Sequence, residues 1–469
     1  MLEKNSEIIV TIECLGANGE GIAKLDKYII FIPFALTGEK VKIKVLKVKQ
    51  NLVFAKVLDI MTPADDRVRP KCKVFTKCGG CQLQHIKYNI QLKLKAKNIV
   101  DCFYKIAGIN FEVLPPVKSD FIYGYRNKLQ LPVGTDSNGD TVVGFFAENS
   151  HRIVPIEKCP IHPDWSTDII DIFKDYIRKY GVTGFNENSG QGLLRHIVVR
   201  EIGGKFIICI VINGQKIENS DYLISRISEK FKYFNLYINI NTFDSNVIFG
   251  KRFICLYGEK KFDEEEFGIS FYAGPETFVQ INSEIRRKLY DKVIKLAGVD
   301  NSLIIDAYSG GGLLTALLAK NCGMAYGIEI INEAVSCADE LAENNGLIGK
   351  MINICGKVEE KLKPLLNSLN NPEFTLILDP PRKGCDLTVI KTILELRPKK
   401  IIYISCNPST LARDVGLMTG HLIYEEKNIV KNPEIDSEKT NYNIELIQPY
   451  DMFPQTKHVE TLICLRAVK

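Results

Sequence analysis

The sequence predicts a multidomain α/β protein in which a small β-barrel and a β-rich middle region precede a doubly wound parallel sheet. Short strand-like runs separated by turn residues fill residues 7–60, and strand-like runs dominate again from about 121 to 270. From about residue 275 onward helical and strand patterns alternate, which is typical of a parallel sheet covered by helices. We therefore expect domains at 1–62, 63–270 and 271–469.

Composition places the chain among globular proteins. Its 469 residues are 45% hydrophobic and 25% charged. Apolar runs such as Phe206–Ile212 are far too short to cross a membrane, and no segment resembles a signal peptide. We expect a cytoplasmic monomer without a membrane partner. In such a chain the 14 scattered cysteines favour metal binding or catalysis over disulfides.

The N-terminal region combines evenly spaced strands with positive charge. Residues 37–105 contain 16 Lys or Arg against 5 Asp or Glu, although the whole chain has a net charge of only +5. This block predicts a polyanionic partner, with a solvated lysine face as the alternative. Small basic β-barrels often bind single-stranded nucleic acid. The expected strands are Ile8–Ile12, Ile29–Pro33, Val41–Val48 and Phe54–Ile60.

A cysteine-bearing loop at 61–85 follows the barrel. Cys72, Cys78 and Cys81 lie within ten residues, and a fourth cysteine, Cys159, directly precedes a proline. Four thiols fit zinc or an iron–sulfur cluster, and the grouping of three plus one favours a 4Fe–4S cluster. Four unconnected thiols are the remaining reading.

A lysine-rich helix is expected at 86–107, and it can pack on the last domain. In the strand-rich middle region we single out Tyr125–Lys128 and Leu194–Arg200. Strict alternation would place Arg195 on one face of the second strand and His196 on the other.

The last domain shows the alternation most clearly. Ligands of open α/β sheets bind at the carboxyl ends of the strands, so residues that directly follow strands are candidates for a site. The expected helices are Ile281–Ala297, Leu313–Lys320 and Asn332–Asn344, and the expected strands are Leu303–Ala307, Ala325–Ile330, Phe374–Leu378 and Lys400–Ser405.

A glycine loop follows the first strand of this domain. Gly310, Gly311 and Gly312 allow close approach of a ligand to the backbone. Glu329 ends the next strand, where it can accept hydrogen bonds from a ribose diol. The glycine spacing departs from the dinucleotide pattern, and a later strand ends in Asp-Pro-Pro. Both features favour S-adenosyl-L-methionine over a nicotinamide dinucleotide.

Cys406 directly follows the strand-like run 400–405 and is the strongest candidate nucleophile. Asn407 and Pro408 break the strand, and we expect Ser409 and Thr410 to cap a helix that starts near Leu411. A thiol beside a helix N-terminus should be stabilised as its thiolate. Near the C-terminus, 453–460 supplies His458 and a candidate general base, Glu460. A cysteine with a glutamate is also compatible with a hydrolase.

Five motifs in order give the chain its resemblance to a known family, the S-adenosylmethionine-dependent RNA uracil-5-methyltransferases. The motifs are Phe278-Val279-Gln280-Ile281-Asn282, Asp306-Ala307-Tyr308-Ser309-Gly310, Asp379-Pro380-Pro381-Arg382-Lys383-Gly384, Ser405-Cys406-Asn407-Pro408 and His458-Val459-Glu460. The resemblance covers nearly the whole chain. It implies that the N-terminal barrel is an OB-like TRAM domain, that the last domain is a Rossmann-like methyltransferase and that the four cysteines are the cluster ligands of the ribosomal-RNA branch.

The resemblance also implies roles for individual residues. Cys406 is the nucleophile that adds to C6 of uracil, and Glu460 is the base that removes the C5 proton. The residues Gln280, Tyr308, Gly310, Glu329 and Asp379 line the site of the methyl donor and target base. Leu313 stands where we would expect a polar residue, and its side chain cannot hydrogen-bond to the donor.

The expected activity is methylation of C5 of a specific uridine in 23S ribosomal RNA. A transfer-RNA T-loop methyltransferase is the first alternative, because it shares the catalytic motifs. The cysteine cluster and the added barrel favour ribosomal RNA. The second alternative is a non-catalytic RNA-binding iron–sulfur protein, and the intact Cys406 and Glu460 argue against it.

Overall fold

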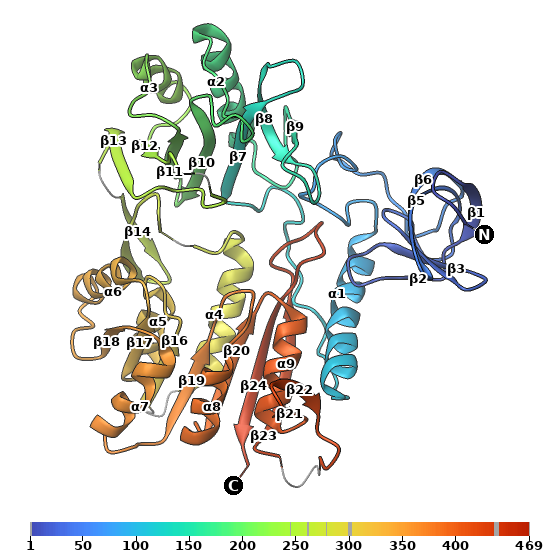
Figure 1. Ribbon diagram of the computed structural model, residues 1–469. Coiled ribbons are helices and arrows are strands. Elements are labelled where there is room, and N and C mark those ends of the chain that lie inside the picture. Colours follow the sequence, from blue (N-terminus) through green and yellow to red (C-terminus); the bar gives the residue numbers. More distant parts are fainter. Residues whose placement is uncertain are drawn as a thin grey trace. The chain divides into compact units, whose positions relative to one another are not determined.

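The computed structural model describes residues 2–243, 245–259, 262–277, 279–298, 303–435 and 440–468. Phe278, which begins one of the motifs, lies outside these residues. The chain divides into two compact units (Figure 1). Unit 1 comprises Met1–Leu94, Asp120–Glu259 and Phe453–Lys457, and unit 2 comprises Lys95–Ser119, Lys260–Met452 and His458–Lys469.

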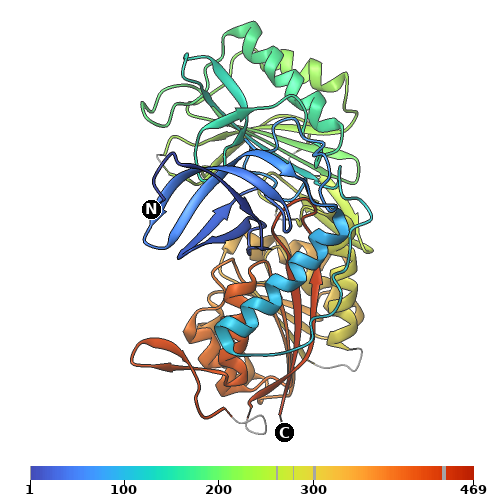
Figure 2. The same cartoon turned by 90° about the vertical axis from the view of Figure 1, so that its right-hand side faces the viewer.

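The first sheet of unit 1 curls around an apolar interior (Figure 2). Its order is β1-β5-β6-β4-β3-β2, with β4 and β6 parallel. The four predicted strands are confirmed to within two residues, whereas β2 and β3 were not predicted. The bounds are β1 Glu7–Thr11, β2 Cys14–Leu15, β3 Gly21–Leu25, β4 Tyr28–Ile32, β5 Lys40–Lys49 and β6 Leu52–Thr62. Alternation along β5 buries Val41, Ile43 and Val45 and leaves Lys42, Lys47 and Lys49 exposed.

The second sheet of unit 1 has the order β13-β12-β11-β10-β7-β8-β9. Its strands are β7 Lys128–Thr135, β8 Thr141–Phe146, β9 Ile153–Pro155, β10 Leu194–Ile202, β11 Lys205–Ile212, β12 Phe234–Ile240 and β13 Arg252–Tyr257. Helices α2 (Trp165–Tyr180) and α3 (Ser220–Ser228) pack together in this part of the chain.

One prediction for this sheet needs correction. Residues 125–127 precede β7 and are not part of a strand: the Arg126 N–H donates to the Ile161 carbonyl in a loop, and the Asn127 carbonyl accepts a hydrogen bond from the Glu201 N–H near the end of β10. Leu194–Arg200 is confirmed as a strand. Ile197, Val198 and Val199 are all buried, because β10 lies inside the sheet with both faces covered.

The predicted helix at 86–107 is present as α1 (Tyr88–Cys102), which continues into a π-helical turn, η1 (Phe103–Ala107). Residues 95–107 belong to unit 2. Their apolar residues Ile99, Phe103 and Ala107 lie in one buried core with Leu411 and Val415. The lysine-rich helix therefore has an apolar stripe, and this stripe packs into the core of unit 2.

Unit 2 contains a seven-stranded sheet in the order β18-β17-β16-β19-β20-β24-β23 (Figure 1). The strands from β18 to β20 run parallel, and β24 and β23 are antiparallel additions. The predicted strands of this domain are confirmed, and β18 is an addition. The bounds are β16 Leu303–Ala307, β17 Ala325–Glu329, β18 Met351–Cys355, β19 Phe374–Leu378, β20 Lys400–Ser405, β23 Tyr442–Tyr450 and β24 Glu460–Ala467.

The helices of unit 2 pack in two groups. One contains α4 (Ser283–Ala297), α5 (Leu313–Asn321) and α6 (Asn332–Asn344), and the other contains α7 (Val358–Ser368), α8 (Leu387–Leu396) and α9 (Pro408–Thr419). Two hairpins complete the unit, β14 (Phe262–Glu266) with β15 (Ile269–Ala273) and β21 (Leu422–Glu425) with β22 (Asn428–Lys431). The multidomain α/β prediction is confirmed. Among the described helices, none has the length and apolar composition needed to span a membrane.

Candidate active site

Three of the predicted site residues meet at one edge of the unit 2 sheet. Cys406 directly follows β20, and Asp379 directly follows the neighbouring parallel strand β19. Strand β24 pairs with β20 in the opposite direction, with Thr461 opposite Ser405. Glu460, the first residue of β24, therefore stands beside the end of β20. Antiparallel pairing thus brings the C-terminal carboxylate to the thiol.

Asn407 caps the helix that follows Cys406. Its side-chain oxygen accepts a hydrogen bond from the Ser409 N–H at 3.1 Å, and Pro408 occupies the first helical turn. The predicted cap at Ser409 and Thr410 is therefore wrong, and the helix starts earlier than expected. The earlier start holds Cys406 immediately outside the first turn of α9.

The surroundings of Cys406 favour its neutral thiol. Burial, together with the carboxyl groups of Glu460 and Asp379, raises the pKa of the half-buried thiol to about 11, although Arg382 opposes the shift. Burial thus outweighs the stabilisation of the thiolate that we expect from the helix N-terminus. Arg382 lies in the Asp379–Gly384 motif, but the sequence did not indicate that it lowers the pKa of the Cys406 thiol.

Glu460 is held in a buried position, with 2% of its surface exposed. It lies opposite Tyr450 in the β23–β24 pair. Burial raises the pKa of Glu460 well above its usual value, Asp379 raises it further and Arg382 lowers it. The carboxyl group therefore stays protonated to higher pH than an exposed glutamate.

Further acidic groups lie close to Asp379. Burial raises the pKa of Asp379 to about 7. Burial also raises the pKa of Asp306 to about 7, although a 2.6 Å hydrogen bond from the Thr315 hydroxyl opposes the shift. Tyr290 of α4 has its pKa raised by burial and by Asp379. Such a concentration of acidic groups favours a ligand that carries positive charge.

Side chains of α9 hold the loop that follows Asp379. Asp414, which is fully buried, accepts hydrogen bonds from the Cys385 N–H at 2.8 Å and from the Tyr403 hydroxyl at 2.6 Å. The Asn407 amide donates to the Arg382 carbonyl at 3.0 Å. A Cβ atom at Gly384, where φ is +76°, would lie 2.5 Å from Asp414 Oδ2. The loop bearing Arg382 is therefore fixed relative to Cys406.

The glycine loop connects two of the predicted cofactor residues. One oxygen of Glu329 accepts a hydrogen bond from the Gly310 N–H at 3.0 Å, and the other accepts one from the Ile331 N–H at 2.9 Å. A Cβ atom added at Gly310 or Gly311 would meet nothing within 4 Å, so the loop borders open space. Tyr308 begins the loop with a φ of +69°, a strained value for this residue type. The structure thus brings Tyr308, Gly310 and Glu329 together.

Gln280 lies on the segment that enters α4. Its side chain is half-buried, and its main-chain carbonyl accepts a hydrogen bond from Arg286 at 3.3 Å. The helix begins after Asn282, whose side chain accepts a hydrogen bond from the Ile285 N–H. The cap and the Arg286 contact position the main chain that carries Gln280.

The four predicted cluster cysteines lie near one another in unit 1. Burial, together with the charges of Cys159, Cys78 and Cys72, raises the pKa of Cys81 to about 12. The Gly80 N–H lies 3.4 Å from the sulfur of Cys78, in the manner of donors that stabilise metal-bound thiolates. However, no group of three or more His, Cys, Asp or Glu side chains in the described ranges is arranged to hold a metal ion. The residue type and the burial of these cysteines fit a thiolate-ligated centre. Their sulfur atoms, however, are not arranged around a common position for a metal ion.

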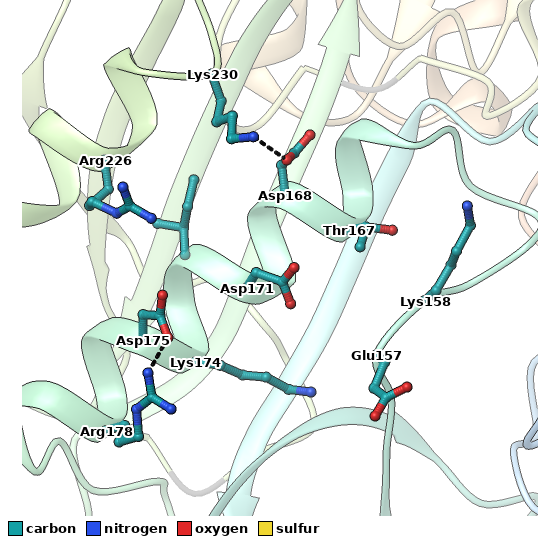
Figure 3. Close-up of a pocket in the computed structure, with 11 residues that line it drawn as sticks. Glu157, Lys158, Thr167, Asp168, Asp171, Lys174, Asp175, Arg178, Arg226 and Lys230 are labelled. Carbon is teal, nitrogen blue, oxygen red and sulfur yellow. Dashed lines mark hydrogen bonds and ion pairs between the residues drawn. The ribbon is translucent and has the colours of Figure 1, made fainter.

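A hollow of about 660 Å³ lies elsewhere in unit 1, along α2 (Figure 3). Its walls are mostly charged, and its charges are partly paired, as between Asp168 and Lys230 at 3.1 Å and between Asp175 and Arg178 at 2.7 Å. Its lining includes none of the predicted site residues.

The chain is similar to known proteins over its whole length. A family model described as TRAM domain matches residues 2–58, and one described as tRNA (Uracil-5-)-methyltransferase matches residues 265–468. An uncharacterized RNA methyltransferase of Clostridium acetobutylicum is 35% identical over 100% of this chain and 98% of the relative. Another, from Halalkalibacterium halodurans, is 36% identical over 99% of this chain and 98% of the relative.

One solved structure matches both units. The crystal structure of Pyrococcus abyssi tRNA (uracil-54, C5)-methyltransferase in complex with S-adenosyl-L-homocysteine has a TM-score of 0.74 and 26% sequence identity. The match covers 97% of this chain and 99% of that chain.

Proposed function

The chain belongs to the S-adenosyl-L-methionine-dependent RNA (uracil-5-)-methyltransferases that carry a TRAM domain, and we propose that it methylates C5 of a specific uridine in 23S ribosomal RNA. The observation that carries the catalytic proposal is the meeting of Cys406, Asp379 and Glu460 at one sheet edge, where each carboxyl group shifts the pKa of the thiol. RNA is the substrate class of the family.

The proposed reaction proceeds through a covalent bond between Cys406 and the base. C5 of uracil is a poor nucleophile, so the thiolate first adds to C6 and moves an electron pair to C5. C5 takes the methyl group and still carries its proton. Glu460 removes that proton, the C5–C6 double bond forms again, and the C6–S bond breaks. The products are 5-methyluridine, S-adenosyl-L-homocysteine, a protonated Glu460 and a free thiolate.

The Cys406 thiol must become a thiolate before it can attack C6 of the base. The thiol of Cys406 has a pKa of about 11, so it must lose its proton when substrate is bound. Arg382 is the nearby cation that lowers the pKa of both Cys406 and Glu460. We propose that Arg382 assists both proton transfers through its charge.

Five residues hold the donor and the base in this proposal. S-adenosyl-L-methionine supplies a methyl group on a positively charged sulfur. Tyr308, Gly310 and Glu329 line the open space at the glycine loop, and Gln280 approaches from the segment before α4. Asp379 contributes negative charge and orients the extruded base through its polar edge.

The cysteines Cys72, Cys78, Cys81 and Cys159 are proposed to hold a 4Fe–4S cluster. Their mutual effect on pKa, the burial of two of them and the N–H donor to Cys78 support a shared centre.

RNA binding is proposed for the N-terminal sheet. The exposed lysines of β5 and the exposed ring of Phe54, stacked on Phe31 at 5.5 Å, offer charge and a surface for base stacking. The whole-chain likeness to a transfer-RNA enzyme favours a second candidate, transfer RNA. That likeness means that the barrel does not by itself separate the two substrates.

The deciding experiment maps 5-methyluridine by mass spectrometry in ribosomal and transfer RNA from cells with and without the gene. Loss from 23S ribosomal RNA supports the proposal, and loss from transfer RNA alone supports the second candidate. Unchanged 5-methyluridine in both RNAs would overturn both.

A further inference from the structure

The loop that delivers Glu460 is anchored to the cysteine-bearing region. Nine residues, 451–459, connect Tyr450 at the end of β23 to Glu460 at the start of β24. Residues 453–457, the tip segment, belong to unit 1, whereas the residues on both sides belong to unit 2. Because Glu460 directly follows this loop in the chain, we expect the tip segment to help set the position of Glu460.

A reciprocal pair of amides holds the tip segment. The Gln91 side chain donates to Gln455 Oε1 at 3.0 Å, and the Gln455 N–H donates back to Gln91 Oε1 at 3.1 Å. The same Gln91 amide donates to the carbonyls of Leu83 at 3.1 Å and Ile86 at 2.9 Å. Both glutamines are almost fully buried, at 1% and 2% exposed. Every polar atom of the Gln91 side chain is thus used, and an apolar residue would leave several groups unsatisfied.

The contacts continue to the residues that follow Cys81. The Leu83 N–H donates to the Gln455 carbonyl at 3.0 Å. The Lys457 N–H donates to the side-chain oxygen of Gln82 at 3.4 Å, and the Gln82 amide donates to the Gly79 carbonyl at 2.8 Å. The tip segment therefore rests on the same stretch of chain that carries Cys78 and Cys81.

The backbone of the tip segment is strained at Gln455. Gln455 has a φ of +71°, which is strained for a residue with a side chain. Before the tip, Asp451 forms a fully buried ion pair with Lys95 at 2.5 Å. Both ends of the loop are thus fixed, and release of the tip would change the path of the chain into Glu460.

We propose that Gln91, Gln455 and Gln82 are positioning residues for Glu460, so that the cysteine-bearing region controls the proton-removal step. The inference rests on the proposed function, because it assigns Glu460 as the base. Addition of Cys406 and methyl transfer do not need Glu460, and they should proceed when the tip is released. Removal of the C5 proton should then become slow, and the methylated covalent adduct should accumulate.

The test compares two products in single turnovers on RNA that carries tritium at C5 of uridine. Wild-type protein should release one tritium for each methyl group transferred. Gln91→Leu and Gln455→Leu should transfer methyl faster than they release tritium, with adduct visible on a denaturing gel. We expect kcat to fall about tenfold with an almost unchanged KM for RNA. The reason is that a displaced catalytic group lowers the rate of its step, by up to about a hundredfold for a displacement of about 1 Å.

A matched control separates positioning from stability. Asn239 is another buried amide of unit 1, with hydrogen bonds to Gly250 and Arg252, and Asn239→Leu removes a similar set of contacts. It should lower stability and leave the ratio of methyl to tritium at one. If Gln91→Leu fails to fold, Gln82→Ala provides the test of the positioning role. The Gln82 side chain is half-buried, and the substitution removes its hydrogen bonds to Lys457 and Gly79.

The outcomes distinguish this inference from the proposed function. A ratio of one in every folded variant, with no adduct, would overturn the positioning role. A wild-type protein without methyl transfer, or a Glu460→Gln variant without adduct, would instead overturn the assignment of the base. An elevated ratio in the glutamine variants together with a ratio of one in Asn239→Leu would support the inference.

Discussion

The negative charge of Asp379 raises the pKa of Glu460, so two carboxyl groups from different strands act on each other at one edge of the sheet. Both groups also raise the pKa of the Cys406 thiol. Each electrostatic contact predicts how a substitution at one residue changes the chemistry of another.

Asp379→Asn should shift the pH dependence of proton removal. The Asp379 charge disfavours ionisation of Glu460, so its loss should lower the pKa of Glu460 and move the acidic limb of adduct breakdown to lower pH. The measurement is the rate of tritium release from preformed adduct between pH 5 and 9. The position of the limb is informative even though Asp379→Asn should also slow methyl transfer. An unmoved limb would contradict the coupling.

Cys406→Ala should reduce methyl transfer by more than about a thousandfold, because the attacking atom is lost. RNA binding, measured by filter retention, should change little. Cys337→Ala, which removes an exposed thiol on α6, is the matched control and should retain full activity. Methyl transfer by Cys406→Ala at a normal rate would exclude the nucleophile assignment.

Glu460→Gln should trap the methylated RNA on the protein, because the amide cannot accept the C5 proton. Turnover should fall by at least about a hundredfold, the usual contribution of a general base. A denaturing gel should show RNA migrating with the protein, and the double variant with Cys406→Ala should lose this band. Normal turnover of the single variant would show that another group removes the proton.

Arg382→Met should raise the pKa of the Cys406 thiol, because the nearby cation favours the thiolate. The pKa is measured in the free protein from the pH dependence of Cys406 alkylation. Lys383→Met is the neighbouring control, since Lys383 pairs with Asp386 and should leave the thiol unchanged. Equal effects of the two substitutions would point to general surface charge.

Anaerobically prepared protein should contain iron and absorb broadly near ~400 nm, as expected of an iron–sulfur centre ligated by thiolates. Cys81→Ser should lose both the iron and the absorbance, whereas Cys322→Ala, which removes a buried thiol of unit 2, should retain both. Colourless protein with stoichiometric zinc would show that the cysteines hold a different metal.

Local patterns predicted much of unit 2. Its strands consist of continuous apolar runs because helices cover both faces of the sheet, and such runs are recognisable without any partner. Patterns failed where neighbours decided the outcome. The strand expected from Tyr125 begins only at Lys128, the residue at which the chain starts to pair with β10.

The fold class, the alternating domain and the positions of Cys406 and Asp379 at strand ends could all be predicted from the amino-acid sequence. These features depend on periodicity and on residues that are adjacent in the chain. Three relationships became evident only in the folded chain: Glu460 lies beside Cys406, burial raises the thiol pKa to about 11, and Gln91 pairs with Gln455, 364 residues away. Such relationships depend on distances through space and on exclusion of water, which sequence separation does not reveal.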